Sequence, residues 1–180
     1  MQLLLLRHAK SDRSAEIGDH GRPLSARGKR GAPRIGAFMH AKAYDPSFVL
    51  CSTAERAKQT LELVLPLFNS EPEITYDAHL YLAEWPQLLA EIHQVAAGAS
   101  PLLVIGHNPG LEQLAIELAR PPKDARERRN LRKMTNKFPT AAFAVLEFGV
   151  SDWRAVQRGS GALCDFVRPK DLPQRERQKS

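Results

Sequence analysis

The apolar residues of this chain occur in short uninterrupted runs, and stretches with helical spacing follow them. Unbroken apolar runs are typical of strands buried on both faces of a sheet, whereas apolar residues that recur every three or four positions are typical of amphipathic helices. The runs that predict strands are Gln2–Leu6, Phe48–Cys51, Ile74–Tyr76 and Pro101–Ile105. The helical spacing predicts helices over 25–43, from residue 55 onward, over Pro86–Ala97 and from Pro109 onward.

Two of these helices have start signals. Ser52-Thr-Ala-Glu55 has the pattern of a capping box, and the apolar stripe that includes Leu61 and Val64 follows it. Asn108 is a suitable N-cap and Pro109 a suitable first helical residue. We therefore expect a strand to turn directly into a helix at both places.

The C-terminal third has a different pattern. Ala142–Phe148 and Trp153–Gln157 alternate in polarity around Gly149–Asp152, which predicts a closing β-hairpin. Taken together, strands that alternate with helices predict an α/β fold. The architecture that we expect is a three-layer sandwich with a mainly parallel central sheet flanked by helices.

Length and composition fit one domain. The chain has 180 residues, of which 43% are hydrophobic and 26% charged, and a domain of this size buries roughly 70% of its unfolded surface. We assign residues 1–168 to a single domain. The polar tail over 169–180 is expected to be flexible, because it has too few apolar residues to pack.

The cysteines and the N-terminus bear on the compartment. Cys51 and Cys164 lack CxxC spacing and are expected to be reduced thiols. The apolar run at the N-terminus stops at Arg7-His8, far short of the roughly 18 residues of a membrane span. These features predict a cytoplasmic protein.

The formal net charge is +6, and it is concentrated late in the chain. Between Arg120 and Lys137, eight Lys and Arg residues stand against Asp124 and Glu127. A net positive charge is compatible with nucleic-acid binding, with anionic substrates or with simple solubility. We interpret this stretch as a solvated helical face or a mobile insertion, with steering of an acidic phosphoprotein as the alternative.

Three predicted strand-to-helix junctions carry the candidate chemistry: Arg7-His8 in the first, Arg56 in the second and His107 in the third. In open α/β sheets, ligands bind beyond the carboxyl ends of the strands, so these side chains are expected to converge. Helix N-termini there add backbone donors for an anion. Each motif alone also has a structural explanation. Together, two histidines and two arginines without a carboxylate cluster indicate a phosphate site rather than a metal site.

These motifs resemble the histidine phosphatase superfamily, whose fold is phosphoglycerate mutase-like, and more closely its SixA-type phosphohistidine phosphatases. The segments that carry the resemblance are Arg-His-Ala-Lys-Ser at 7–11, Arg-Pro-Leu at 22–24, Cys-Ser-Thr-Ala-Glu-Arg at 51–56, Gly-His-Asn-Pro-Gly at 106–110 and Phe-Pro-Thr-Ala at 138–141.

The resemblance implies a phosphohydrolase that needs no metal or other cofactor. His8 would attack phosphorus, with its other ring nitrogen held by a partner that we expect to be a backbone carbonyl. Arg7, Arg56 and, if it is protonated, His107 would stabilise the phosphoryl oxygens. Arg22 is a further candidate for phosphate binding, with a surface turn as the alternative, and for Asn108 a helix cap is favoured over a role in the site.

The proton donor for the leaving group is the open question. Glu84 is the first candidate by chain position, with Asp19 and Glu16 as others, and each of them also fits a surface carboxylate. A phosphohistidine substrate relaxes this requirement because imidazole leaves readily. The implied substrate is thus a phosphohistidine in a signalling or phosphotransfer protein.

Two alternatives remain. One is a small-molecule phosphomonoester phosphatase of the same superfamily. The other is a basic nucleic-acid-binding protein, against which no aromatic residue interleaves with Arg120–Lys137. By sequence spacing, none of the six histidines forms a close pair with cysteine or carboxylate, so no metal site is expected.

Overall fold

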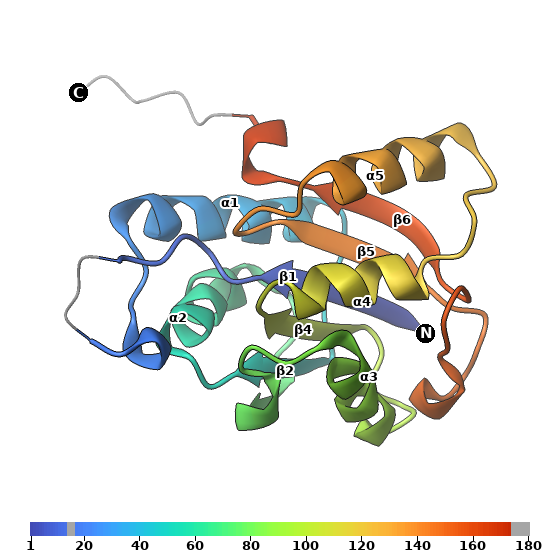
Figure 1. Cartoon of the computed structure of the whole chain (residues 1–180), viewed down its shortest axis with the longest axis horizontal. Coiled ribbons are helices and arrows are strands. Elements are labelled where there is room, and N and C mark those ends of the chain that lie inside the picture. Colours follow the sequence, from blue (N-terminus) through green and yellow to red (C-terminus); the bar gives the residue numbers. More distant parts are fainter. Residues whose placement is uncertain (14–16, 174–180) are drawn as a thin grey trace.

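The computed structural model describes residues 1–13 and 17–173, and within them six strands form one sheet in the order β3-β2-β4-β1-β5-β6 (Figure 1). The strands β1 to β4 are parallel where they pair, and β5 alone runs antiparallel to its neighbours β1 and β6. The prediction of a mainly parallel sheet is therefore confirmed. The strands are β1 Gln2–Arg7, β2 Phe48–Ser52, β3 Glu73–Asp77, β4 Leu102–Gly106, β5 Phe143–Glu147 and β6 Ala162–Val167.

Helices cover both faces of the sheet, which confirms the three-layer architecture (Figure 1). The helices α1 Ala26–Ala41 and α2 Glu55–Val64 pack on one face, and α3 Trp85–Gln94, α4 Gly110–Leu118 and α5 Ala125–Asn136 pack on the other. In β1, Leu3 and Leu5 enter the core on the α3–α4 side, whereas Leu4 and Leu6 enter the core on the α1–α2 side. This alternation explains why the strand is an unbroken apolar run.

The predicted hairpin around Gly149–Asp152 is wrong. Trp153–Ala155 forms a short 3-10 helix, η4, and the partner of β5 is β6. The Trp153 side chain is fully buried, and its indole N–H donates to the carbonyl of Ala99 at 2.9 Å. The alternating pattern came from a loop that buries one large side chain, not from a strand.

Both predicted helix caps are also wrong. Ser52 is the last residue of β2, and Ala54 is the N-cap of α2 without a side-chain bond. Asn108 lies before the Pro109 N-cap of α4, and its amide donates to the Glu112 carboxylate at 2.7 Å. In each case the polar side chain is bound elsewhere.

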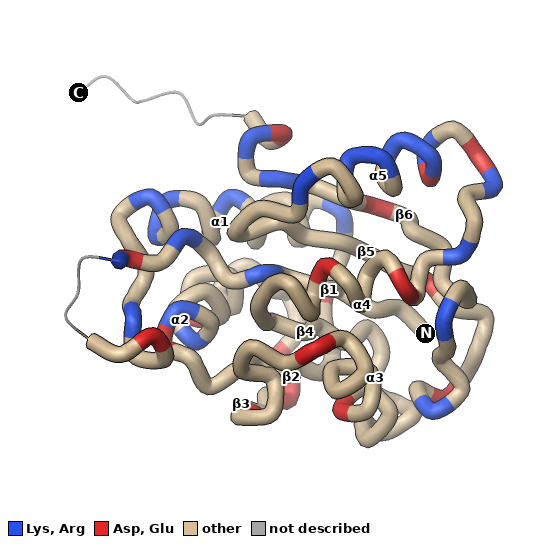
Figure 2. Tube along the Cα trace, viewed as in Figure 1, with Lys and Arg blue, Asp and Glu red and all other residues tan. Residues whose placement is uncertain are grey.

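The basic stretch is an ordered helix rather than a mobile insertion. Asp124 caps α5 by accepting from the backbone N–H of Glu127 at 2.8 Å. Met134 and Asn130 are buried, and the Asn130 amide donates to the carbonyl of Cys164 in β6 at 2.9 Å. Lysines and arginines occupy many of the other positions of α5, and others follow α1 (Figure 2).

The beginning of the expected tail is structured. Pro169–Asp171 forms the short helix η5, and Arg168 forms an ion pair with Asp171 at 2.9 Å. Arg34 in α1 donates to the carbonyl of Leu172 at 2.8 Å. The rest of the expected tail, 174–180, lies outside the described residues. In the part of the chain that is described, no helix is long and apolar enough to cross a membrane.

Candidate active site

The three predicted junctions meet at one edge of the sheet. β1 lies beside β4, and Arg7 pairs with Gly106 in the parallel register. His8 and His107 therefore leave the sheet side by side, with their ring centroids 5.0 Å apart. Arg56 reaches the same place from the first turn of α2, which follows the adjacent strand β2. The sheet topology alone brings these three side chains together.

The tautomer of His8 is fixed by its neighbours. Its Nδ1 lies 2.7 Å from the carbonyl oxygen of Ala9, so Nδ1 carries the hydrogen and donates. This carbonyl is the backbone partner that the sequence led us to expect. The Nε2 atom accepts a hydrogen bond from Arg56 Nε at 3.3 Å. Nε2 therefore presents a lone pair to the site.

Arg56 is the centre of the cluster and is only 2% exposed. Besides His8, its guanidinium donates to Nδ1 of His107 at 3.3 Å and to the carboxylate of Asp19 at 3.0 Å. The backbone carbonyl of Arg56 accepts from the Thr60 hydroxyl at 2.6 Å, and that hydroxyl accepts from the N–H of Ala9 at 2.9 Å. Thr60 thus links the helix that carries Arg56 to the loop that follows His8.

His107 is oriented by a residue that we had interpreted as a helix cap. Its Nε2 lies 2.8 Å from the hydroxyl oxygen of Ser52. Because Arg56 donates to Nδ1, the hydrogen of His107 is on Nε2 and points to Ser52. The capping pattern did not reveal this role, because the contact forms only when β2 and β4 pair and His107, directly after β4, lies beside Ser52.

Both histidines are neutral in the free site. Burial, together with the positive charges of Arg56 and Arg7, lowers the pKa of His8 to about 3. Burial, the neighbouring His8 and Arg56 lower the pKa of His107 to about 3 as well. The role that the resemblance implies for a protonated His107 therefore requires a further negative charge beside its ring.

Two further arginines supply unused donors. Arg7 donates one N–H to the carbonyl of Phe138 at 2.7 Å, and Arg22 forms an ion pair with Asp19. The Nε atoms of Arg7 and Arg22 are buried and have no hydrogen-bond partner in the described part of the protein. Because an unpaired buried donor costs free energy, these atoms are suited to an anionic ligand.

The candidate proton donors are placed apart from one another. Asp19 lies in the site, where its carboxylate accepts from Tyr81 at 2.6 Å as well as from Arg56. Chiefly through the bond from Tyr81, and further through Arg56 and Arg22, the pKa of Asp19 is lowered. Glu84 is exposed at the N-cap of α3, and Glu16 lies outside the described residues.

Tyr81 is a site residue that the sequence did not indicate. Besides its bond to Asp19, its ring meets the ring of His107 edge-on at a centroid distance of 5.4 Å. Asn108 takes no part in the cluster through its described contacts, because its amide is bonded to Glu112 and Phe138.

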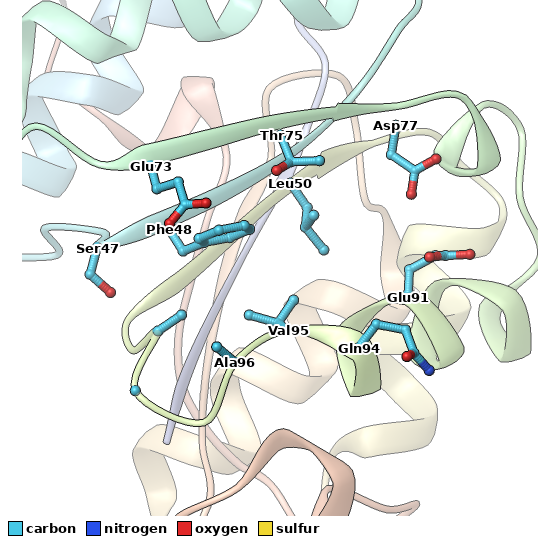
Figure 3. Close-up of a pocket in the computed structure, with 12 residues that line it drawn as sticks. Ser47, Phe48, Leu50, Glu73, Thr75, Asp77, Glu91, Gln94, Val95 and Ala96 are labelled. Atoms are coloured by element: carbon cyan, nitrogen blue, oxygen red, sulfur yellow. The ribbon is translucent and has the colours of Figure 1, made fainter.

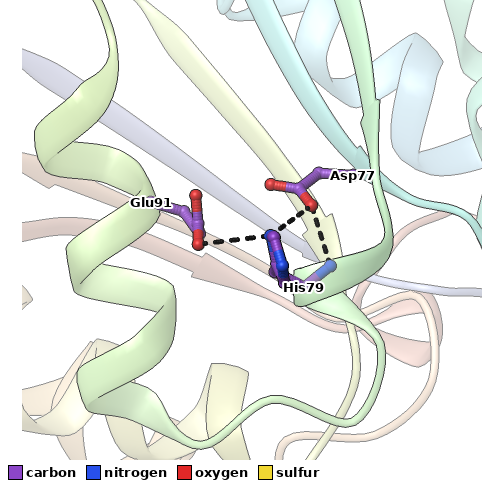
Figure 4. A group of neighbouring side chains, drawn as sticks. All are labelled: Asp77, His79 and Glu91. Carbon is purple, nitrogen blue, oxygen red and sulfur yellow. Dashed lines mark hydrogen bonds and ion pairs between the residues drawn. The ribbon is translucent and has the colours of Figure 1, made fainter.

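A second group of titratable side chains lies at the other face of the sheet. A cavity of about 620 Å³ between the β2–β3 edge and α3 is lined by Glu73, Asp77 and Glu91 among others (Figure 3). His79 Nδ1 lies 3.2 Å from the Asp77 carboxylate and 3.7 Å from that of Glu91 (Figure 4). The expectation that no histidine has carboxylates at ligand spacing is therefore wrong, because α3 brings Glu91 back to His79.

Comparisons with known proteins identify the family of the chain. The pattern of the histidine phosphatase superfamily (branch 1) matches residues 3–85. An uncharacterized protein of Mycobacterium tuberculosis is 36% identical over 165 residues, which are 92% of this chain and 100% of that protein.

Two solved structures share the fold. A structure assigned as phosphohistidine phosphatase SixA from Nakamurella multipartitia has a TM-score of 0.80 and 28% identity, over 93% of this chain and 95% of that one. A protein histidine phosphatase SixA complexed with tungstate has a TM-score of 0.74 and 24% identity, over 95% of this chain and 99% of that one. With its phosphoglycerate mutase-like sheet and its histidine pair, the chain belongs to the histidine phosphatase superfamily.

Proposed function

We propose that this phosphatase removes phosphate from phosphohistidine in a signalling or phosphotransfer protein, with His8 as the nucleophile. The observation that carries the proposal is the state of His8. Its Nε2 lone pair faces the site, its Nδ1–H is held by Ala9, and its low pKa keeps the ring neutral. A neutral, oriented imidazole is the form that attacks phosphorus.

The proposed reaction has two displacements at phosphorus. In the first, His8 Nε2 forms a P–N bond as the P–N bond of the substrate breaks, and the released imidazole takes up a proton from solvent. In the second, water attacks the phosphorylated His8, and phosphate and the free histidine side chain are formed. Neither step needs a metal ion or a redox group.

The cations around His8 suit the charge of the phosphoryl group. Arg56 would exchange its bond to His8 for a bond to a phosphoryl oxygen, and the unpaired Nε atoms of Arg7 and Arg22 supply further donors. The negative charge of the phosphoryl group would raise the pKa of the adjacent His107 and favour its protonated form. Asn108 stays a weaker candidate, because Glu112 already holds its amide.

The carboxylates favour a substrate whose leaving group needs little acid. Asp19 is held ionised by its three partners, so it is a poor proton donor at neutral pH. Glu84 is exposed and is not bonded to the histidine pair by any described contact. An alkoxide leaving group requires such a donor, whereas imidazole does not. This difference favours a phosphohistidine over a small phosphate ester.

A basic groove supports a protein substrate. The groove has a volume of about 1230 Å³, begins at Ala9 and Lys10 directly after His8, and follows α1. Its lining includes seven Lys and Arg side chains and no carboxylate among the described residues: Lys10, Arg27, Arg30, Arg34, Lys137, Arg168 and Lys170. An acidic protein surface fits such a lining.

Two free cysteines fit a reducing cytoplasm, where signalling proteins of this kind act.

The first test compares phosphate release from a phosphohistidine-bearing protein and from p-nitrophenyl phosphate, in EDTA, by wild type and His8→Ala. We expect release by wild type, faster from the phosphoprotein, and at least about a thousandfold less by the variant. His40→Ala is the matched control, because His40 lies on α1 and its ring hydrogen-bonds to the carbonyl of Leu67, away from the histidine pair. Equal rates for His8→Ala and wild type would refute the nucleophile, and faster release from the ester would favour a small-molecule phosphatase.

A further inference from the structure

We propose that Asp77, His79 and Glu91 form a binding site for a zinc-type divalent cation, separate from the catalytic histidines. The three residues come from the end of β3, from the short helix η3 (Ala78–Leu80) and from α3. Each offers one ligand atom, and these atoms all lie within 4.8 Å of one another. Figure 4 shows that the Asp77 carboxylate, at the end of β3, and the Glu91 carboxylate, on α3, both point toward the His79 imidazole.

The spacing of the ligand atoms fits a tetrahedral ion. Zinc binds imidazole nitrogen and carboxylate oxygen at about 2.0–2.1 Å, so two ligand atoms of a tetrahedron are about 3.3–3.4 Å apart. The distances from His79 Nδ1 to Asp77 Oδ1 and to Glu91 Oε1 are 3.2 and 3.7 Å. These two distances fit, and the separation between the Asp77 and Glu91 ligand atoms, at most 4.8 Å, would shorten as the side chains close around an ion at the centre.

The ligands are held by the fold but open to solvent. Asp77 caps η3, and its Oδ1 accepts from the backbone N–H of His79 at 2.8 Å. Glu91 is fixed to the helix α3, and the His79 side chain is 72% exposed. Two ligands thus sit on regular elements, and the third is accessible to an ion from solution.

The local charge favours a cation. The cavity beside the cluster is lined by Glu73, Asp77 and Glu91, and its described lining contains no lysine or arginine (Figure 3). Two carboxylates balance the charge of a divalent ion. The imidazole favours zinc and related transition metals over magnesium or calcium, which prefer oxygen. Water can occupy the fourth position from the side of the cavity.

The position of the site suggests its role. An ion here would tie the β3–η3 segment to α3, and η3 ends directly before Tyr81, which contacts His107 and Asp19. It would act as a structural clip behind the active site and would not contact the phosphoryl group. A stabilised native state is the direct thermodynamic consequence of such binding.

The test is a calorimetric titration of untagged, EDTA-stripped and dialysed protein with zinc chloride. We expect wild type to bind one equivalent of zinc. His79→Ala should lose this binding, whereas His40→Ala and His8→Ala should both retain it. Glu91→Gln should weaken binding at least tenfold. At a hundredfold excess of zinc over its dissociation constant, the melting temperature of wild type should rise by roughly 5–10 °C.

Because His79 is exposed, His79→Ala should melt within about 2 °C of wild type in EDTA. The proposed site would be refuted if wild type bound no zinc, or if His79→Ala bound zinc as wild type does. It would also be refuted if only His8→Ala abolished binding. The readout is metal stoichiometry rather than phosphate release, so its failure and the failure of the phosphatase proposal are distinguishable.

Discussion

The two histidine clusters of this protein contain the same side chain in opposite surroundings. His8 and His107 are buried and meet Arg56, whereas His79 is exposed between two carboxylates. The first environment leaves both imidazoles neutral and surrounds them with donors, which suits an anion. The second surrounds an imidazole with negative oxygens, which suits a cation. The neighbours, rather than the histidines, decide which charge each cluster binds.

After the loss of His8 itself, the largest expected effect comes from removing the cation of the first cluster. Arg56→Gln keeps a long polar side chain but loses the charge that contacts both histidines. We expect kcat/KM to fall about 10²–10³-fold for phosphoprotein and ester alike, since one preorganised donor to a transition-state oxygen has this value. Steady-state kinetics with Arg158→Gln as control check this, because Arg158 is exposed and bonded to Glu117. A loss below tenfold would contradict a role for Arg56 at the phosphoryl group.

The second prediction concerns pH. A pKa of about 3 keeps His8 neutral as the pH falls, so the nucleophilic form persists to well below pH 5. A histidine with the ordinary pKa of 6.5 would lose about thirtyfold in kcat/KM by pH 5. We expect kcat/KM to stay within about threefold between pH 8 and pH 5, corrected for ionisation of p-nitrophenyl phosphate. A fall that begins near pH 6.5 would show that His8 is not shielded as its burial implies.

The position of the first cluster could be predicted from the sequence because each of its main residues lies at or after the end of an apolar run. Arg7 ends β1, His8 and His107 directly follow β1 and β4, and Arg56 lies in the first turn of α2 after β2, so the strand order brings their elements together at one edge. The cluster of Asp77, His79 and Glu91 had no comparable pattern in the sequence. Its members lie on different elements, and only the packing of α3 against the β3 edge brings Glu91 to His79.

Residues that support the site were missed for the same reason. Ser52 fits a capping box in sequence, and only the position of His107 directly after the neighbouring strand β4 shows the Ser52 hydroxyl to be an imidazole partner. The packing of α5 on the sheet could not be predicted from its sequence, because its apolar side consists of little more than Met134 and Leu131. The buried amide of Asn130 completes the contact of this helix with β6. Local pattern predicts elements, but it does not predict contacts between distant ones.

A third prediction tests how strictly the orientation of His107 matters. Ser52→Ala removes the hydroxyl at 2.8 Å from Nε2 and leaves the ring oriented by its bond from Arg56. One hydrogen bond of this kind is worth a factor of about three to ten in kcat/KM. Thr135→Ala, which removes an exposed hydroxyl from α5, is the control. If Ser52→Ala has wild-type kinetics and an unchanged melting temperature, the hydroxyl does not orient His107.

The smallest effect should come from the contact that joins the two regions, Tyr81. Tyr81→Phe keeps the ring against His107 but removes the bond to Asp19, the largest cause of the low pKa of that carboxyl. The pKa of Asp19 should therefore rise, while its bonds from Arg56 and Arg22 remain.

We expect Tyr81→Phe to change kcat/KM about two- to threefold, because only one of several bonds to Asp19 is lost. Tyr44→Phe is a close match, since the Tyr44 hydroxyl donates to Asp165 at 2.5 Å and so links the loop after α1 to β6, a contact that involves neither histidine cluster. A change larger than tenfold for Tyr81→Phe alone would mean that Asp19 is positioned by Tyr81 rather than by the arginines. The segment that carries His79 and Tyr81 would then influence the active site directly, and the two histidine clusters would be coupled rather than independent.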